Sequence, residues 1–584
     1  MTSFSVWAPA HERMRLQLGD LAVDMARDAD GWWRADVPAA GDGTDYSYLI
    51  GDDDQARPDP RSPRQPYGVH GSSRVYDHST FPWTDTLWTG RALPGAVIYE
   101  LHVGTFTDAG TFDAAIERLD HLVALGIDLV ELLPVAAFNG TYNWGYDGVC
   151  WYAPHEAYGG PDGLKRLVDA CHARGLGVVL DVVYNHFGPS GAYAPMFAPY
   201  LAEGANTWGR SLNLDGPGSD EVRKYVIDSA LMWLRDYHID GLRLDAVHAL
   251  VDHGAIHVLE ELAVQVEVLA THVGRPLSLI AESDLNDPRL ITPREAGGYG
   301  LHAQWDDDIH HVLHALLSGE RDGYYGDFGS IDGLAQVLAG AFFHAGTRSS
   351  FRERTHGRPV DRLRTYGHRF IGYLQDHDQI GNRARGDRLS DTVPADLLRI
   401  GALLLFTSPY TPMLFMGEEW SAATPWQFFT SHPETDLGAA VAAGRLAEFA
   451  RHGWPLDAGP LDAVPDPQDP ETFRRSRLDW AEPAVPPHSE MLEFYRDVIA
   501  LRKAHADLSD PRLDAVEVSH GDNYLVMLRG GCTVVANLAA ATLRVDVDAT
   551  TVLLATAPGV GLEPARAGQV IVLVPGRSAA VLRR

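Results

Sequence analysis

Short apolar runs separated by turn residues characterise both ends of the chain. In residues 1–90, runs rich in Trp, Tyr and Val are separated by turn clusters such as Gly41–Gly43 and Gly51–Asp54. This pattern is typical of short β-strands, so we predict an N-terminal β-sandwich. The Pro-rich stretch 57–71 predicts a linker that crosses a surface. Residues 507–584 alternate Val, Leu and Thr with Gly and Asp, which predicts a second, smaller β-sandwich.

Residues 91–506 have a different texture, in which apolar runs alternate with amphipathic helical patterns. Thr111 is placed to cap a helix that ends at Gly126, and the apolar residues between them recur at helical spacing: Phe112, Ile116, Leu119 and Val123. Pro161 and Gly175 bracket a second such helix. Strands are predicted at Val97–Leu101, Leu129–Leu133, Val178–Val183, Gly241–Asp245, Leu277–Ala281, His302–Trp305, Phe370–Leu374 and Pro412–Phe415.

Eight strands that alternate with helices predict an α/β fold, a (β/α)8 barrel of the TIM type. Such barrels carry their chemistry at the carboxyl ends of the strands. The connection 187–219 contains Pro, Gly and Trp with little periodicity, so we predict a loop-rich excursion over that end of the barrel.

Four carboxylates follow predicted strands: Asp181, Asp245, Glu282 and Asp378. A retaining glycosidase needs one carboxylic acid to protonate the departing oxygen and one carboxylate to attack the anomeric carbon. Asp245 and Glu282 end neighbouring strands, which suits this pair of roles. Arg243 lies two residues before Asp245 and therefore points the same way, where its charge favours an ionised Asp245. Glu282 follows an apolar run, so partial desolvation is expected to raise its pKa.

Polar and aromatic residues near these carboxylates are candidates for contact with a sugar. His186 and His377 stand in the pairs Asn185–His186 and His377–Asp378, where they are suited to donate to sugar hydroxyls. Trp144 and Tyr146 fit a sugar-stacking role and a core-packing role equally well. For the run Trp305–His311 we predict a solvated helix start with a sugar contact rather than a metal site.

Charge and cysteine content exclude several classes of partner. The formal net charge of −31 repels nucleic acids and anionic membranes, so we expect neither as a partner and favour a neutral oligosaccharide. The three cysteines are widely spaced, which predicts no disulfide framework and no metal-binding pair. Because no signal-like segment and no run of eighteen apolar residues is seen, we expect a cytoplasmic protein. The sequence sets no expectation for the oligomeric state.

Four segments that contain the strand-end carboxylates resemble the signature regions of the α-amylase superfamily. The resemblance rests on Asp181–His186, Gly241–Asp245, Ala281–Glu282 and His377–Asp378, which occur in the family's order. It implies that Asp245 is the nucleophile, Glu282 the acid/base and Asp378 the stabiliser of the transition state. It also implies that Tyr146, His186, Arg243 and His377 surround the sugar at subsite −1, and we add Trp144 and Asp181 to this substrate-binding set.

Nearly the whole chain is similar to the maltooligosyltrehalose trehalohydrolase family. The similar stretches are Trp144–Val149, Tyr152–Pro161, Leu244–His248, Ile280–Asp287 and Phe415–Trp420. This resemblance implies hydrolysis of the α-1,4 bond next to a terminal trehalose, with no metal or cofactor. It places His248 where related enzymes have a basic residue against the leaving group. The chain departs from the family at Asp306 and Asp376, where asparagine is expected.

Two other functions remain open from the sequence. A glycogen branching enzyme has the same N-terminal sandwich and the same three carboxylates, but transfers the glucan to a hydroxyl group instead of water. A glucan-binding protein on an inactive barrel is the second alternative. It is the weaker one, because such proteins usually lose the acid or the nucleophile and this chain keeps both.

Overall fold

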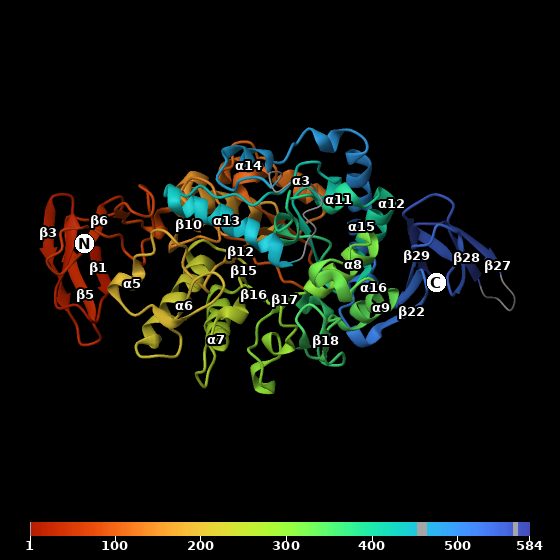
Figure 1. Ribbon diagram of the computed structural model, residues 1–584, viewed down its shortest axis with the longest axis horizontal. Helices are drawn as coiled ribbons and strands as arrows, with labels where there is room; N and C mark the ends of the chain where they lie inside the picture. The colour runs from red at the N-terminus through yellow and green to blue at the C-terminus, as the bar shows by residue number, and fades with distance from the viewer. Residues whose placement is uncertain (1, 453–463, 565–569) are drawn as a thin grey trace.

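The computed structural model describes residues 2–452, 464–564 and 570–584. The chain forms an elongated molecule in which a central barrel separates a β-rich region at the N-terminal end from another at the C-terminal end (Figure 1). In the described part of the chain, no helix is long and apolar enough to cross a membrane. Cys150, Cys171 and Cys532 are all buried, and none of them forms a disulfide.

Eight parallel strands close the predicted barrel. Their order around it is β12-β15-β16-β17-β20-β21-β8-β9. Every predicted barrel strand is confirmed, and each end lies within one residue of its expected position: β8 (Ile98–Leu101), β9 (Leu129–Leu132), β12 (Gly177–Val182), β15 (Gly241–Leu244), β16 (Ser278–Ala281), β17 (Ala303–Trp305), β20 (Phe370–Tyr373) and β21 (Thr411–Phe415). Helices on the outside include α4 (Gly160–His172), α6 (Ser219–Asp236), α7 (Val258–Val273), α8 (Asp307–Ser318), α12 (Ala395–Thr407) and α15 (His488–Ala504).

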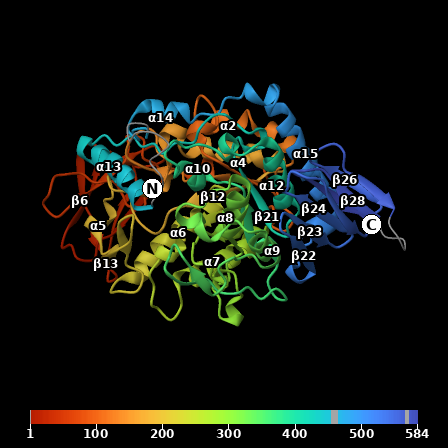
Figure 2. The same ribbon diagram turned by 45° about the vertical axis from the view of Figure 1, so that its right-hand side comes forward.

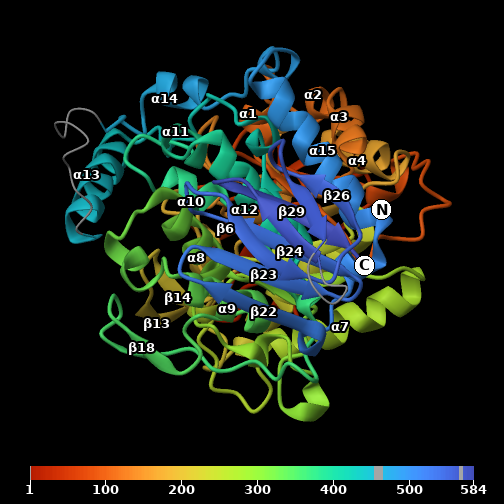
Figure 3. The same cartoon turned by 90° about the vertical axis from the view of Figure 1, so that its right-hand side faces the viewer.

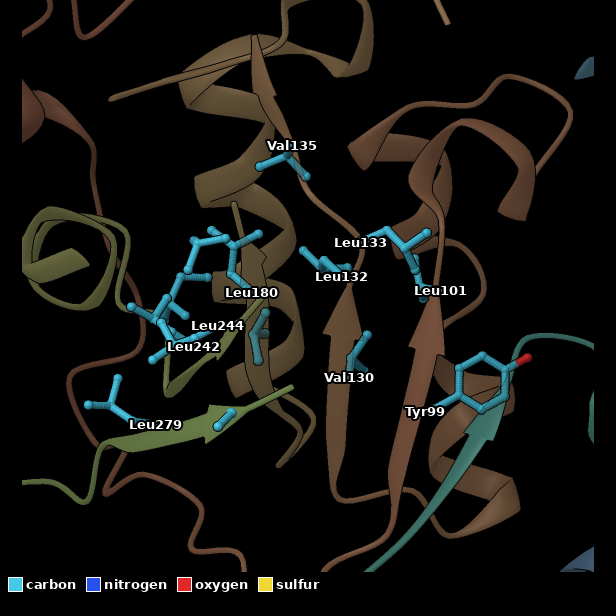
Figure 4. Close-up of a cluster of buried hydrophobic side chains, with 14 of the residues drawn as sticks. Tyr99, Leu101, Val130, Leu132, Leu133, Val135, Leu180, Leu242, Leu244 and Leu279 are labelled. Atoms are coloured by element: carbon cyan, nitrogen blue, oxygen red, sulfur yellow. The ribbon is translucent and has the colours of Figure 1, made fainter. Parts of the chain in front are cut away.

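Alternate residues of the barrel strands pack on opposite faces of the sheet, because successive side chains in a strand point opposite ways. Figure 4 shows one buried cluster that includes Val130, Leu132, Leu180 and Leu242. The residues in alternation with them form a second cluster, with Leu129, Val179, Ile280 and Trp305 among its members. Strands buried on both faces explain why the sequence reads as continuous apolar runs.

The first predicted helix is two helices. Thr111 caps α2 (Phe112–Ile116) by accepting a hydrogen bond from the backbone N–H of Ala114. The chain leaves the helix at Glu117 and starts α3 (Leu119–Leu125), which ends at Gly126 with φ of 97°. Because the break changes which side faces the barrel, Val123 is 43% exposed instead of buried. The prediction of one continuous helix was therefore wrong, although its start and end were right.

The N-terminal region contains two small antiparallel sheets. One has the order β1 (Thr2–Trp7), β5 (Trp32–Val37), β4 (Ala26–Arg27), and the other the order β3 (Leu21–Asp24), β2 (Met14–Leu18), β6 (Asp45–Ile50), β7 (Ser73–Arg74). The stretch 57–71 is packed more tightly than the expected surface linker. Arg61 and Arg64 pair with Asp228 and Glu156 of the barrel at 2.8 and 2.7 Å.

The C-terminal region contains a five-stranded and a three-stranded sheet. The first has the order β22 (Val516–Gly521), β23 (Tyr524–Arg529), β24 (Cys532–Asn537), β29 (Ser578–Arg583), β26 (Thr551–Ala555), and Figure 3 shows it facing the viewer. The second has the order β25 (Leu543–Val547), β28 (Val570–Val574), β27 (Gly561–Pro564). Helices α12 and α15 contact the larger sheet and join it to the barrel.

The excursion 187–219 is partly ordered into regular elements. It contains the short helix α5 (Ala194–Phe197) and a hairpin of β13 (Leu201–Ala205) and β14 (Arg210–Leu212). Figure 2 shows α5 and β13 beside the N-terminal sheets. Trp208, between the two hairpin strands, lies against His186 and His248, so the excursion does reach the strand ends.

Candidate active site

The four predicted carboxylates lie at one rim of the barrel. Asp181 is near the end of β12, Asp245 follows β15, Glu282 follows β16 and Asp378 lies in α10 (His377–Gly381), beyond β20. Backbone hydrogen bonds continue the pairing past the strands, from Asp245 N–H to Val182 O at 3.1 Å and from Glu282 N–H to Leu244 O at 3.0 Å. Neighbouring strands in register therefore bring the predicted nucleophile and acid to the same level.

Arg243 is the cation on which three of these carboxylates converge. Its Nη1 lies 2.7 Å from Asp181 Oδ2 and 2.8 Å from Asp245 Oδ1, and its Nη2 lies 3.7 Å from Glu282 Oε2. The guanidinium is fully buried, and its carbon lies 4.3 Å from the centre of the Trp305 ring. This is the in-phase contact between Arg243 and Asp245 that the sequence predicts.

Both oxygens of Asp245 are held. Oδ1 accepts from Arg243, and Oδ2 accepts from the Asn185 side chain at 2.6 Å. Asn185 in turn accepts at its Oδ1 from His186 Nδ1 at 2.5 Å. Burial lowers the pKa of His186, which favours its neutral ring. The Asn185–His186 pair therefore fixes the orientation of the predicted nucleophile.

Glu282 has the environment of a proton donor. Burial raises its pKa well above the usual range, Arg243 opposes this effect, and Asp245, Asp307 and Asp378 add to it. Its Oε2 accepts from the backbone N–H of Ala246 at 2.6 Å. The side chain keeps 17% of its exposure, so the acid remains reachable from the rim. The desolvation expected from the apolar run before Glu282 is confirmed.

A hydrogen-bonded chain runs from Glu100 through His377 and Tyr146 to Asp181. His377 Nδ1 lies 2.5 Å from Glu100 Oε1, and its Nε2 lies 2.7 Å from the Tyr146 hydroxyl. That hydroxyl donates to Asp181 Oδ2 at 2.6 Å. Burial alone would lower the pKa of His377, but Glu100 and Asp378 raise it to about 10. His377 is therefore a cation at neutral pH, 3.6 Å from Asp378 Oδ2.

Trp144 supports His377 from behind. It is 4% exposed, its indole N–H donates to Gln427 O at 3.0 Å, and its ring stacks on Trp426. Its ring also meets His377 edge to face, with ring centres 5.8 Å apart. Tyr146 is half-buried, and its ring stacks on the ring of His377.

Burial raises the pKa of Asp181 to about 6. The charge of Arg243 opposes this effect, and the charge of Asp245 adds to it.

A second group lies around His248. Its Nδ1 is 4.0 Å from Asp284 Oδ1, and Arg352 Nη2 binds Asp284 Oδ2 at 2.7 Å. The Trp208 ring is 51% exposed and meets His248 edge to face at 6.0 Å. The sequence singled out only His248 in this group. A tryptophan within the predicted excursion was the one signal that could have pointed to Trp208.

The run Trp305–His311 is buried except for Asp307 and His311, which are partly exposed, so the prediction of a solvated helix start was wrong for most of the run. Asp306, Asp308 and His310 are all below 5% exposed, because α8 starts inside the rim and packs against β20. Burial raises the pKa of Asp306 and of Asp376 well above the usual range. Burial therefore shifts both acids towards the neutral form, which carries the same charge as the asparagine that the family resemblance leads us to expect there. In the described residues, no three His, Cys, Asp or Glu side chains are grouped so as to hold a metal ion.

Known proteins resemble this chain over most of its length. Residues 80–196 match the family model described as alpha amylase, catalytic domain. A malto-oligosyltrehalose trehalohydrolase from Mycobacterium tuberculosis is 55% identical over 96% of this chain and 97% of its own length. A crystal structure of an alpha amylase candidate from Salmonella typhimurium is 36% identical, with a TM-score of 0.90 over 100% of this chain and 97% of that one. A 1,4-alpha-glucan branching enzyme from Leifsonia xyli is 33% identical, but over 52% of this chain and 47% of its own.

Proposed function

This chain belongs to the malto-oligosyltrehalose trehalohydrolase family of α-amylase-type glycosidases, and we propose that it releases trehalose by hydrolysing the adjoining α-1,4-glucosidic bond of a malto-oligosyltrehalose. One observation carries the proposal: similarity to a trehalohydrolase extends over 96% of the chain. The proposal is supported by two carboxylates at one rim of the barrel, Asp245 and Glu282, to which we assign the roles of nucleophile and acid.

In the first step, we assign the attack to Asp245 and the proton transfer to Glu282. The Asp245 carboxylate bonds to the anomeric carbon while the bond from that carbon to the glycosidic oxygen breaks. The proton of Glu282 passes to that oxygen, so trehalose leaves as an alcohol. Because Oε2 of Glu282 accepts from Ala246, Oε1 is the oxygen that we expect to hold the proton.

In the second step, water takes the place of trehalose. Glu282, now ionised, removes a proton from the water, and the water oxygen attacks the anomeric carbon. The bond to Asp245 breaks, and the malto-oligosaccharide leaves with the original configuration. Asp378, whose side chain is 46% exposed beside His377, is positioned to bind sugar hydroxyls as the transition state forms.

The substrate-binding roles follow the two groups of side chains. We propose that Tyr146, His186, Arg243, His377, Asp181 and Trp144 form or support the subsite for the glucose that Asp245 attacks. We propose that His248 contacts the leaving trehalose, because Asp284, Arg352 and Trp208 surround it with polar and aromatic surface. A cytoplasmic location is also a proposal, supported by three buried cysteines that form no disulfide.

The branching alternative has less support. Its representative matches about half of this chain, whereas the trehalohydrolase matches 96%. The inactive-barrel alternative conflicts with the presence of Asp245 and Glu282 in one charge network.

Product analysis tests the proposal directly. The purified protein is incubated with maltotriosyltrehalose, and we expect free trehalose and maltotriose in equal amounts. Asp245→Asn and Glu282→Gln should abolish release while the folded circular dichroism spectrum is retained. A change of iodine staining on amylose without any trehalose release would overturn the proposal in favour of branching.

A further inference from the structure

A fifth carboxylate stands at the catalytic rim, and the mechanism above does not use it. Asp307 is the first residue of α8, and only Asp306 separates it from Trp305, the last residue of β17. The barrel order β15-β16-β17-β20 places it between Glu282, which follows β16, and Asp378, which lies beyond β20. Asp307 therefore belongs to the ring of strand-end acids, although it is separated from the others in the sequence.

Buried aromatic rings fix the position of the Asp307 carboxylate. The Tyr373 hydroxyl donates to Asp307 Oδ1, and Tyr373 itself is fully buried. The Tyr373 ring packs on the Trp305 ring, with centres 5.4 Å apart, and Trp305 covers the guanidinium of Arg243. Asp307 is thus anchored to the same packed layer that positions Arg243.

The charges that face Glu282 come from several elements. Arg243 on β15 opposes proton retention, whereas Asp245, Asp307 and Asp378 all favour it, and Asp307 acts more strongly than Asp378. Burial raises the pKa of Asp307 itself, Asp284 and Asp308 add to this effect, and His311 and Tyr373 counter it. Burial and the neighbouring acids favour the protonated form of Glu282, whereas His311 and the donating hydroxyl of Tyr373 favour the ionised form of Asp307.

We propose that Asp307 is a positioning residue for the acid: a fixed carboxylate, anchored by Tyr373, that keeps Glu282 protonated until the glycosidic oxygen accepts its proton. The inference rests on the proposed function, in which Glu282 is the acid. It gives a chemical role to Asp307 in the run Trp305–His311, none of whose residues takes part in the catalytic steps above.

A structural role for Asp307 makes a different prediction. A carboxylate in the first turn of a helix stabilises the helix by its interaction with the helix dipole. If this were its only role, removing the charge would lower stability but would leave the pH dependence of catalysis unchanged. The pH profile therefore separates the two roles.

The test is the pH dependence of kcat/KM for maltotriosyltrehalose in Asp307→Asn. Removal of a negative charge lowers the pKa of Glu282, so the alkaline limb should move to lower pH by about one unit. Asp307→Glu keeps the charge and should restore most of the wild-type profile. Asp308→Asn makes the same charge change in the same turn, where Asn286 and two backbone N–H groups hold the carboxylate, and should leave the limb in place.

A substrate that needs no proton gives a second readout. Fluoride leaves α-maltotriosyl fluoride without general acid catalysis, so Asp307→Asn should match the wild type on this substrate across the pH range. On maltotriosyltrehalose at high pH, the same variant should be about tenfold slower than the wild type, which corresponds to one pH unit. An unmoved limb, or equal losses on both substrates, would overturn the inference. Failure of the wild type to release trehalose would instead contradict the proposed function.

Discussion

At the scale of single residues, Arg243 lies beside two carboxylates to which the proposed mechanism assigns opposite protonation states. It contacts Asp245 at 2.8 Å, and it stands 3.7 Å from Glu282, where the effect of burial on the pKa outweighs that of the Arg243 charge. The difference of 0.9 Å between these contacts, together with the desolvation of Glu282, separates the roles of two neighbouring acids.

Replacing Arg243 should therefore harm both stability and turnover. Arg243→Gln leaves the buried Asp181 and the partly buried Asp245 without their cation, and we expect a loss of about 3–5 kcal/mol in the free energy of unfolding. We also expect kcat to fall by about a hundredfold or more, because the nucleophile loses its orienting contact. Denaturant unfolding and steady-state kinetics measure the two effects. Arg13→Gln, which breaks exposed ion pairs, is the control and should change stability by less than about 1 kcal/mol.

The Glu100–His377 pair makes stability depend on pH. The pKa of His377 in the folded protein, about 10, lies above the ordinary histidine value. The stabilising effect of the pair is therefore complete below about pH 6.5 and is lost as the pH rises towards 10. In Glu100→Gln the charge that stabilises protonated His377 is removed, so the contribution of His377 to stability is smaller. We expect the wild type to lose stability between pH 7 and pH 10 and the variant to lose about 2 kcal/mol less over the same interval. Parallel slopes in denaturant unfolding at several pH values would contradict this assignment.

The contacts that could not be predicted from the sequence share one property. Glu100 and His377 are 277 positions apart, and Asn185 and Asp245 are 60 apart, so their contacts exist only after the barrel closes. Strand-end acids were recognisable because each follows its own apolar run. Glu100 lies inside a strand, where the sequence offers no local sign that a histidine from α10 lies opposite.

At the scale of elements, the periodicity of apolar residues located the barrel strands well and the helix boundaries less well. A four-residue strand buried on both faces gives a compact apolar run, whereas the break between α2 and α3 occurs at Glu117 and Arg118, which are good helix formers. Packing against the barrel, which the local sequence does not encode, decides where that helix breaks. The buried start of α8 was missed for the same reason.

The β13–β14 hairpin should contribute to substrate binding through Trp208. This ring is half exposed beside His186 and His248, so truncation removes a sugar-stacking surface without opening the core. For Trp208→Ala we expect kcat/KM for maltotriosyltrehalose to fall about tenfold, mainly through KM, with little change in melting temperature. Trp208→Phe should recover part of the loss. Equal kinetics for Trp208→Ala and the wild type would exclude this contact.

At the scale of the whole molecule, the N-terminal region supports the excursion that carries Trp208. Trp7 meets Tyr200 edge to face with ring centres 5.7 Å apart, and Tyr48 meets Phe197 in the same manner at 6.1 Å. Tyr200 directly precedes β13, and Phe197 ends α5, so both contacts anchor the chain at the base of the hairpin (Figure 1). We therefore expect residues of the first predicted domain to influence the catalytic rim through the hairpin.

This coupling predicts a kinetic effect from a remote substitution. Trp7→Ala removes a side chain that is 4% exposed, and we expect a stability loss of about 3–5 kcal/mol together with a several-fold rise in KM, because the hairpin loses its support. The alkaline limb of the pH profile should stay in place, since Trp7 contacts none of the groups around Glu282. Leu582→Ala in the C-terminal sheet creates a comparable core defect and should leave KM unchanged. If both variants raised KM equally, the effect would reflect general destabilisation, and the N-terminal region would have no special part in holding the hairpin over the site.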